Sequence, residues 1–348
     1  MAERHVNFEG LQEPGGFAGS GRPPAQVYEL YPRDNREAIA AGIRFLSAKR
    51  EGRHWVEFTE IPGGSDLWIT ALVIAELSNM PVRSMNPALR EELAQSADWM
   101  SGLQNDDGGW GFSAGQESDA ESTSWTILAL RGQGRAVPES ATHFLERCRR
   151  SDGGIGLYPA ERGAGRLSKP ENPDVAALMM RALGTGDASA EDFLKTCWLQ
   201  TNRPLPPARL QSRFHTFAML LEWESMPPTW PVLEKLCELM SSNRAENAFD
   251  QALLLRCLTR LRIQKASSVA AGLRRMQQAD GGWPSSASLR LTVSGSEGSG
   301  PIYSDDQRIL TTAAAVSALA GSANAVTESN HHQIAPRGPM DTSRHARI

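Results

Sequence analysis

The chain has 348 residues, the composition of a soluble globular protein and a formal net charge of −4. This weak negative charge gives no reason to expect binding to nucleic acid. No apolar run approaches the roughly 20 residues that span a bilayer, and no secretory signal is recognisable. The four cysteines lie far apart in helical patterns, which favours buried thiols in a reducing compartment. The sequence therefore predicts a cytoplasmic protein.

The predicted elements are almost all helices. Residues 1–33 are rich in glycine and proline and predict an N-terminal arm, and residues 322–348 predict a disordered tail. Between residues 34 and 321, charged helical segments alternate with apolar ones. The charged segments are 37–49, 87–103, 139–150, 190–199, 232–241 and 266–277. The apolar segments are 67–77, 122–130, 175–183, 214–223, 249–261 and 309–319.

This alternation sets the fold class. A helix that is apolar nearly all round is surrounded by other elements, whereas a one-sided helix lies on the surface. Six alternating pairs therefore predict an all-α (α/α)6 toroid, an inner ring of helices within an outer ring. We expect one domain over residues 34–321. Residues 284–305 form a longer connection, in which 289–293 predict a short extended piece. The sequence is compatible with two roles for this connection, a lid over the cavity and a plain surface loop.

A glycine turn recurs along the chain. Asp107-Gly108-Gly109-Trp110 is repeated at 151–156, with isoleucine in place of tryptophan, and at 278–283. The spacing fits two-helix units of roughly 43 residues. Glycine permits the left-handed backbone that ends a helix, and the tryptophan can pack between units while its N–H finds a carbonyl. In other units Pro62-Gly63-Gly64 and the proline-rich 204–207 connection replace the motif.

The turn followed by an apolar helix resembles the QW-type repeat of squalene–hopene cyclases and, more distantly, of the β-subunits of protein prenyltransferases. The resemblance covers roughly residues 35–321, a single toroid, and is carried by Gln104–Gly111 and Gln277–Trp283. It implies the toroid fold more specifically than an activity, because the turn is a packing device. Prenyltransferase chemistry is disfavoured, since the zinc ligands that family needs are missing: Asp250 is followed two residues later by Ala252 instead of cysteine.

Polar residues at the starts of the inner helices are the candidate site. In a toroid these starts surround one mouth of the central cavity. Acids at such positions also cap helix N–H groups, and this role alone explains any single one of them. Aromatic side chains there can stabilise a cation by about 0.5–2 kcal/mol each, or be plain core. The substrate-binding candidates are Asp66, Trp68, Trp125, Asp174, His215, Phe217, Asp250 and Asp306.

The resemblance also implies the catalytic residues. Squalene–hopene-type cyclases carry an Asp-x-Asp-Asp-Thr motif whose middle aspartate protonates an alkene or epoxide. Asp119-Ala120-Glu121-Ser122-Thr123 falls in register with it, which makes Glu121 the expected acid and Asp119 the residue that positions it. Ser122 replaces the third aspartate and cannot support the acid in the same way. The helix N-terminus favours a carboxylate, so Glu121 must be desolvated to remain protonated.

The leading hypothesis is a class II terpene cyclase that binds an isoprenoid or similar apolar molecule and starts ring closure by protonation. No cofactor or metal is expected, except Mg²⁺ if the substrate carries a diphosphate. Two alternatives stay open: a non-catalytic toroid that binds an apolar or carrier-bound ligand, and an acid–base cyclase acting on a non-terpenoid intermediate. The sequence does not decide the oligomeric state or whether the protein contacts a membrane peripherally.

Overall fold

The computed structural model describes residues 34–333 apart from 62, 82–83, 152, 163–172, 185–187, 201–209, 213, 224–244 and 292–299. Its described inner helices are α2 (Leu67–Ser78), α4 (Ala120–Gly132), α6 (Pro173–Leu183), α8 (His215–Glu222), α10 (Ala248–Arg260) and α12 (Ile309–Gln333). The described outer helices are α1 (Asn35–Ala48), α3 (Pro87–Ser101), α5 (Glu139–Arg147), α7 (Ala188–Gln200) and α11 (Ala266–Arg275). A short 3₁₀ helix, η3, covers Ala160–Arg162.

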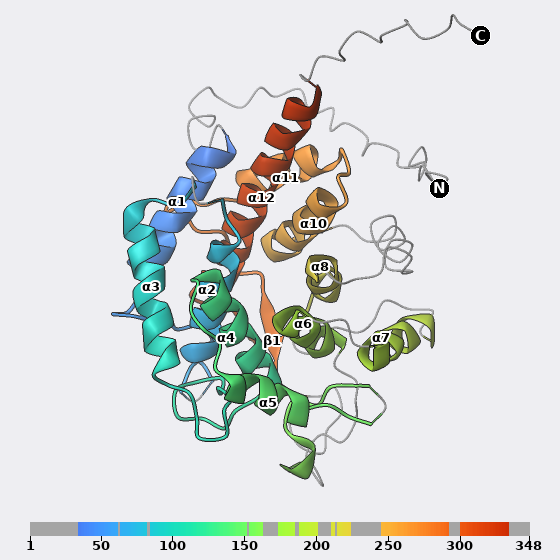
Figure 1. Ribbon diagram of the computed structural model, residues 1–348. Coiled ribbons are helices and arrows are strands. Elements are labelled where there is room, and N and C mark those ends of the chain that lie inside the picture. Colours follow the sequence, from blue (N-terminus) through green and yellow to red (C-terminus); the bar gives the residue numbers. More distant parts are fainter. Residues whose placement is uncertain are drawn as a thin grey trace, which may run out of the picture.

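The inner helices form a closed ring. Each packs on the next in chain order, and α12 returns to pack on α2 (Figure 1). Every residue of α2 from Leu67 to Leu77 is buried, whereas α5 buries only Ala141, Phe144 and Leu145. This contrast follows from position, since an inner helix is surrounded and an outer helix covers one side only. The predicted (α/α)6 toroid is confirmed.

One helix end differs from the sequence prediction, and three predicted segments lie outside the described residues. α12 continues to Gln333, past the expected end of the last inner helix at residue 319. The chain from 322 to 333 has no glycine or proline, so nothing in it terminates a helix, and polarity alone made it look like a tail. The expected outer helix 232–241, the arm at 1–33 and the end of the tail lie outside the described residues.

Tryptophan turns join α3 to α4 and α11 to α12. The indole N–H of Trp110 donates to the carbonyl of Met100 at 2.9 Å, and that of Trp283 donates to Leu273 at 2.7 Å. Gly108 has a φ of 91° and lies so close to the Ser140 carbonyl that an added Cβ would be 2.4 Å from it. Only glycine fits such a position. The expected carbonyl partner of the tryptophan N–H is therefore confirmed.

A further copy of this joint was hidden in the sequence. Trp55 donates its indole N–H to the carbonyl of Leu46 at 2.7 Å and its backbone N–H to the Thr70 hydroxyl at 2.9 Å. The backbone N–H groups of Trp110 and Trp283 donate in the same way to threonines on α4 and α12, at 3.0 and 3.1 Å. Pro62-Gly63-Gly64 is therefore not the substitute for the motif in this unit, because Trp55 fills the role without adjacent glycines.

A short hairpin lies at the N-terminal ends of the inner helices. β1 (Ser288–Arg290) pairs antiparallel with β2 (Ile302–Ser304), so the predicted extended piece is present. Leu289 of β1 is fully buried and forms an isolated bridge with Leu210. In the view of Figure 1, β1 is drawn within the ring of inner helices. The β1 side of the connection is therefore packed into the molecule, whereas β2 is largely exposed.

Candidate active site

Glu121 lies in the first turn of α4 and is only 3% exposed. The indole N–H of Trp68, on the neighbouring inner helix α2, donates to Glu121 Oε1 at 3.2 Å. The Trp68 ring lies between Phe58 and Phe112, with ring centroids 6.0 and 5.7 Å away. The predicted acid is thus placed against aromatic rings at the N-terminal mouth of the ring.

Asp119 is the N-cap of α4. Its Oδ1 accepts the Ser122 backbone N–H at 2.8 Å, and its Oδ2 accepts the Ser122 hydroxyl at 2.7 Å. Sequence reasoning expected Asp119 to position Glu121. The hydrogen bonds described for its carboxylate instead fix the first turn of the helix that carries Glu121. Ser122, which stands where the related motif has an aspartate, is the partner in this cap.

The other predicted acids are also engaged in local structure. Asp66 accepts the N–H groups of Leu67 and Ala114, and Asp174 accepts the N–H of Val175. Asp250 accepts the Ser212 hydroxyl and the Asn247 amide. Asp306 accepts the Thr59 hydroxyl at 2.7 Å. The contacts of Asp66 with Leu67 and of Asp174 with Val175 are made to helix N–H groups, whereas those of Asp250 and Asp306 are made to polar side chains. None of these contacts joins the four aspartates to Glu121.

A central hollow runs along the axis below this mouth. It is lined by Leu72, Glu76, Trp125, Leu210, His215, Met219, Phe249, Leu253, Arg256, Leu310 and Ala314. Trp125 follows Glu121 by one helical turn on the same face of α4. Of the predicted residues, Trp125 and His215 line the hollow, while Phe217 is buried without being part of its wall. The volume is about 10 Å³, so side chains nearly fill it.

Besides the Glu76–Arg256 ion pair, this wall contains two polar side chains, His215 and Trp125, which carry no charge. Burial, together with the charge of Arg256, lowers the pKa of His215 to about 3. The Nδ1 of His215 and the indole N–H of Trp125 have no hydrogen-bond partner among the described residues. The wall therefore offers an aromatic ring and an uncharged imidazole beside the Glu76–Arg256 ion pair.

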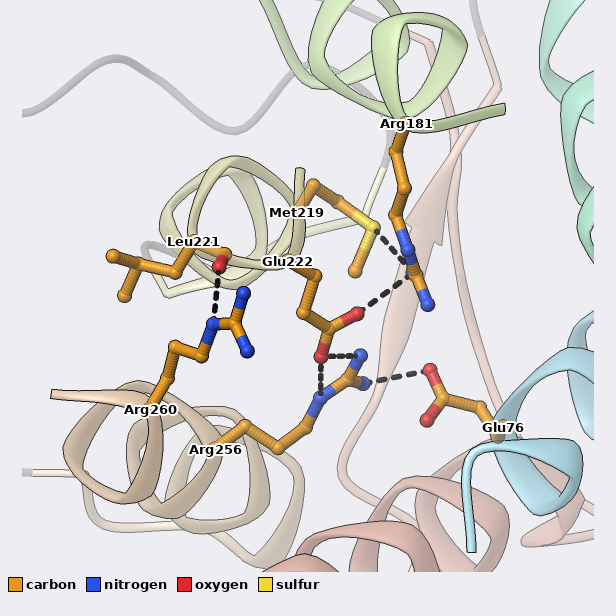
Figure 2. A network of polar contacts seen from close by, with 7 residues as sticks. All are labelled: Glu76, Arg181, Met219, Leu221, Glu222, Arg256 and Arg260. Carbon is orange, nitrogen blue, oxygen red and sulfur yellow. Dashed lines mark hydrogen bonds and ion pairs between the residues drawn. The ribbon is translucent and has the colours of Figure 1, made fainter. Parts of the chain in front are cut away.

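An ionic cluster closes the hollow at its lower end; it consists of Glu76, Arg181, Glu222 and Arg256 (Figure 2). Arg256 Nη1 is 2.6 Å from Glu76 Oε1, and Arg256 Nε is 2.7 Å from Glu222 Oε1. Arg181 Nη1 is 2.8 Å from Glu222 Oε2. Although burial alone would raise it, the charges of Arg181 and Arg256 lower the pKa of Glu222.

Beyond the cluster lies a larger cavity of about 620 Å³, which we call the C-terminal pocket. It is lined by the last turns of the inner helices and includes Arg131, Arg181, Glu222, Arg256 and Arg260. Sequence reasoning expected the main cavity at the opposite mouth, so this is a correction. The available signal was the arginines and glutamates inside otherwise apolar segments, because such charges are rarely buried unless paired.

A second buried carboxyl was also missed. Glu57 is fully buried, and its carboxylate accepts the backbone N–H groups of Gln307 and Ile309, each at 2.7 Å, at the start of α12. Burial, with the nearby charge of Asp305, raises the pKa of Glu57 to about 8. No local motif marks it, since it caps a helix about 250 residues later in the chain.

Within the described part of the chain, no group of three or more histidines, cysteines, aspartates or glutamates is arranged to hold a metal ion. None of the helices described combines the length and apolarity that crossing a membrane requires.

No family model matches this chain. Among curated proteins it is 34% identical to the drimenyl diphosphate synthase of Streptantibioticus cattleyicolor over 169 residues, which is 47% of this chain. The match spans about a third (32%) of the length of that protein. This match alone therefore does not assign the activity of that synthase to this chain.

Solved structures share the whole toroid. The type II terpene cyclase MstE from Scytonema superposes with a TM-score of 0.72 and 21% identity, covering 84% of this chain and 100% of that one. A protein from Actinoplanes gives 0.67 and 23%, covering 83% and 100%. MstE variants were solved with geranylgeranyl dihydroxybenzoate, described as substrate, and with merosterolic acid A, described as product. The protein has the fold of a single-toroid type II terpene cyclase.

Proposed function

We propose that this protein is a class II terpene cyclase that starts ring closure of an isoprenoid-type substrate by protonation from Glu121. The observation that carries the proposal is the position of Glu121: buried in the first turn of an inner helix, against Trp68, one turn above Trp125. The shared fold of type II terpene cyclases supports it. Asp119 acts indirectly by fixing the turn of α4 through Ser122.

The first step transfers the carboxyl proton of Glu121 to one carbon of a terminal alkene. The O–H bond breaks, the alkene electron pair forms the new C–H bond, and the other carbon becomes a cation. The carboxylate left on Glu121 keeps the hydrogen bond from the Trp68 indole, which strengthens as the acceptor becomes charged. Attack by the next alkene closes a ring, and loss of a proton ends the sequence, so the product is an isomer of the substrate.

The surrounding side chains suit a cationic intermediate. The face of Trp68 stabilises positive charge by about 0.5–2 kcal/mol and offers no strong nucleophile. Trp125 contributes its second face, since the Arg181 guanidinium already lies over one side of the ring, 6.0 Å from its centroid. The neutral state of His215 adds no repelling charge to the wall. Burial at this mouth also keeps out water, which would otherwise capture the cation.

The substrate must create part of its own space. A hollow of about 10 Å³ does not hold an isoprenoid chain, so the reacting alkene lies at the mouth beside Glu121 and Trp68. Met219 and Leu253 line the hollow below, and rotation of such side chains would admit the chain. A protonation-initiated reaction needs no metal. Mg²⁺ enters only if the substrate carries a diphosphate.

The test is incubation in D₂O with farnesyl and geranylgeranyl diphosphate and with a prenylated dihydroxybenzoate, followed by mass spectrometry. Protonation by an exchangeable carboxyl predicts a cyclic product that carries one deuterium. Glu121→Gln is expected to lower turnover by roughly 1000-fold or more while still binding substrate. Glu117→Gln is the matched control, because Glu117 precedes the same helix and is exposed.

Cyclic product without deuterium, or an active Glu121→Gln variant, would overturn the proposed acid. Saturable binding without product from the wild-type protein would assign the protein as a non-catalytic toroid. Asp119→Asn separates positioning from catalysis: it keeps the cap acceptor for the Ser122 N–H, so a small loss of turnover with unchanged substrate affinity is expected.

A further inference from the structure

The C-terminal pocket is separated from the proposed reaction site by the ionic cluster. Arg256 lines both the central hollow and the C-terminal pocket, and Glu76 and Glu222 hold its guanidinium in place. The two spaces therefore meet at a charged partition, which an apolar chain does not cross without desolvating an ion. A ligand in the pocket of about 620 Å³ would occupy a site of its own.

Three arginines present unused donors around this pocket. Arg260, from α10, makes one hydrogen bond among the described residues, from Nε to the Leu221 carbonyl at 3.1 Å (Figure 2). Arg131, at the end of α4, donates to one acceptor among the described residues, the Ala182 carbonyl. The nearby Asp98 forms its ion pair with Arg135 and not with Arg131. Among the described residues, Arg181 uses Nη1 for Glu222 and Met219, and its guanidinium lies 6.0 Å from the centroid of the Trp125 ring. Their remaining N–H groups can serve a ligand.

The charge of the pocket favours an anion with more than one negative charge. Four arginines line the pocket. Among the described residues, two glutamates form ion pairs with them: Glu222 pairs with Arg181 and Arg256, and Glu76 pairs with Arg256. Guanidinium groups match phosphate and carboxylate oxygens in paired hydrogen bonds. The remaining wall is partly apolar, with Leu128, Leu221, Trp223 and Ala318.

We propose that the C-terminal pocket binds a small molecule with a diphosphate-type head group on an apolar body. Arg260 and Arg131 hold the head at the rim, Arg181 contacts it from the floor, and the apolar wall covers the body. The same head group occurs in free diphosphate and in a prenyl diphosphate, so the experiment compares both. The site does not depend on the cyclase reaction, because the partition separates it from Glu121.

A simpler role for these arginines is neutralisation of the helix ends. The C-terminus of a helix carries about half a negative charge, and Arg131 and Arg260 each donate to a carbonyl near such an end. That role uses one donor of each side chain and would be served equally by lysine. It does not require three guanidinium groups from α4, α6 and α10 to face one cavity.

Isothermal titration with pyrophosphate and with geranyl diphosphate tests the site. We expect saturable binding of both, at least fivefold tighter for geranyl diphosphate. Arg260→Met and Arg131→Met should each weaken pyrophosphate binding by tenfold or more, and Arg260→Lys should restore only part of it. Arg275→Met is the control, because Arg275 is an exposed arginine on the outer helix α11 and should bind as the wild type.

The two rim arginines are exposed, so their replacement is expected to leave the fold intact, which the melting temperature checks. Absence of saturable pyrophosphate binding, or equal affinities of the wild type and both rim variants, would overturn the site. Equal affinity for pyrophosphate and geranyl diphosphate would overturn the proposal that the pocket also binds an apolar body. Because pyrophosphate cannot cyclise, and Glu121→Gln should bind it normally, this outcome is independent of the cyclase assay.

Discussion

The two ends of the toroid bury glutamates in opposite electrostatic surroundings. At the N-terminal mouth, burial and the neighbouring Asp305 raise the pKa of Glu57 to about 8. At the other end the Glu222 side chain is 23% exposed, and Arg181 and Arg256 lower its pKa against the effect of burial. A buried carboxyl keeps its proton where no cation reaches it and loses it where arginines do. The proton-donating chemistry proposed for Glu121 suits the first end, and anion binding suits the second.

The largest expected effect comes from breaking the ionic cluster. Arg256→Met leaves Glu76 buried without the arginine that pairs with it and leaves Glu222 with Arg181 alone, and removal of one partner from a buried pair costs about 3–5 kcal/mol. We expect the free energy of unfolding, measured by denaturant titration, to fall by that amount. The double replacement of Glu76 and Arg256 by methionine keeps the Arg181–Glu222 pair and should recover most of it. A loss below 1 kcal/mol for the single variant would show that the cluster is not a buried unit.

The opposite pKa shifts predict the pH dependence of stability. Glu57 has a folded pKa above its unfolded value, so its contribution is present below about pH 4.5 and is lost as the pH rises through about 8. Each pH unit in that window costs roughly 1.4 kcal/mol at most. Glu222 has a lowered pKa, so its contribution is present above its unfolded value and is lost on acidification.

Unfolding titrations between pH 4 and 9 should therefore show maximal stability at mildly acidic pH. Glu57→Gln should flatten the alkaline side, at the cost of acceptors for the N–H groups of Gln307 and Ile309. A profile of Glu57→Gln parallel to that of the wild type would assign the alkaline loss to another group.

The ring architecture could be predicted because it is periodic. Alternating charged and apolar segments, such as 87–103 and 122–130, identify outer and inner helices without any knowledge of long-range contacts. The glycine turns at Gly108 and Gly281 mark the joints for the same local reason. Trp55 was missed as a joint because its unit lacks the paired glycines, although its hydrogen bonds are those of Trp110.

The site could be predicted only as a set of helix starts. Sequence placed Glu121 and Trp68 at one mouth, but not in hydrogen-bond contact, since that depends on how α2 and α4 pack. Asp66 and Asp250 follow the same start pattern; Asp66 accepts the N–H of Leu67, and Asp250 accepts the Ser212 hydroxyl. The ionic cluster joins residues up to 180 positions apart, so no local pattern pairs Glu76 with Arg256.

A smaller effect separates stability from chemistry at the N-terminal mouth. Trp68→Phe keeps an aromatic ring beside Phe58 and Phe112 but removes the N–H donor to Glu121. A hydrogen bond to a charged acceptor contributes about 1.5–3 kcal/mol, so turnover should fall between roughly 10-fold and 100-fold with little change in KM. Trp110→Phe removes an equivalent donor from a packing joint. Trp110→Phe should lower the melting temperature and leave turnover unchanged. Lower turnover in Trp110→Phe, with unchanged turnover in Trp68→Phe, would place the chemistry away from Glu121.

The smallest expected effect tests whether the acids around this mouth are caps or ligands. Asp66 accepts the N–H groups of Leu67 and Ala114 at 2.6 and 2.9 Å, so Asp66→Ala should cost about 1 kcal/mol of stability. Asp66→Asn keeps an oxygen acceptor and should cost only a few tenths. Neither change should alter KM, because no described contact turns this carboxylate toward Glu121. A rise in KM shared by both variants, with stability intact in Asp66→Asn, would mean that the negative charge binds substrate. The mouth would then resemble the opposite end in using fixed charge for recognition.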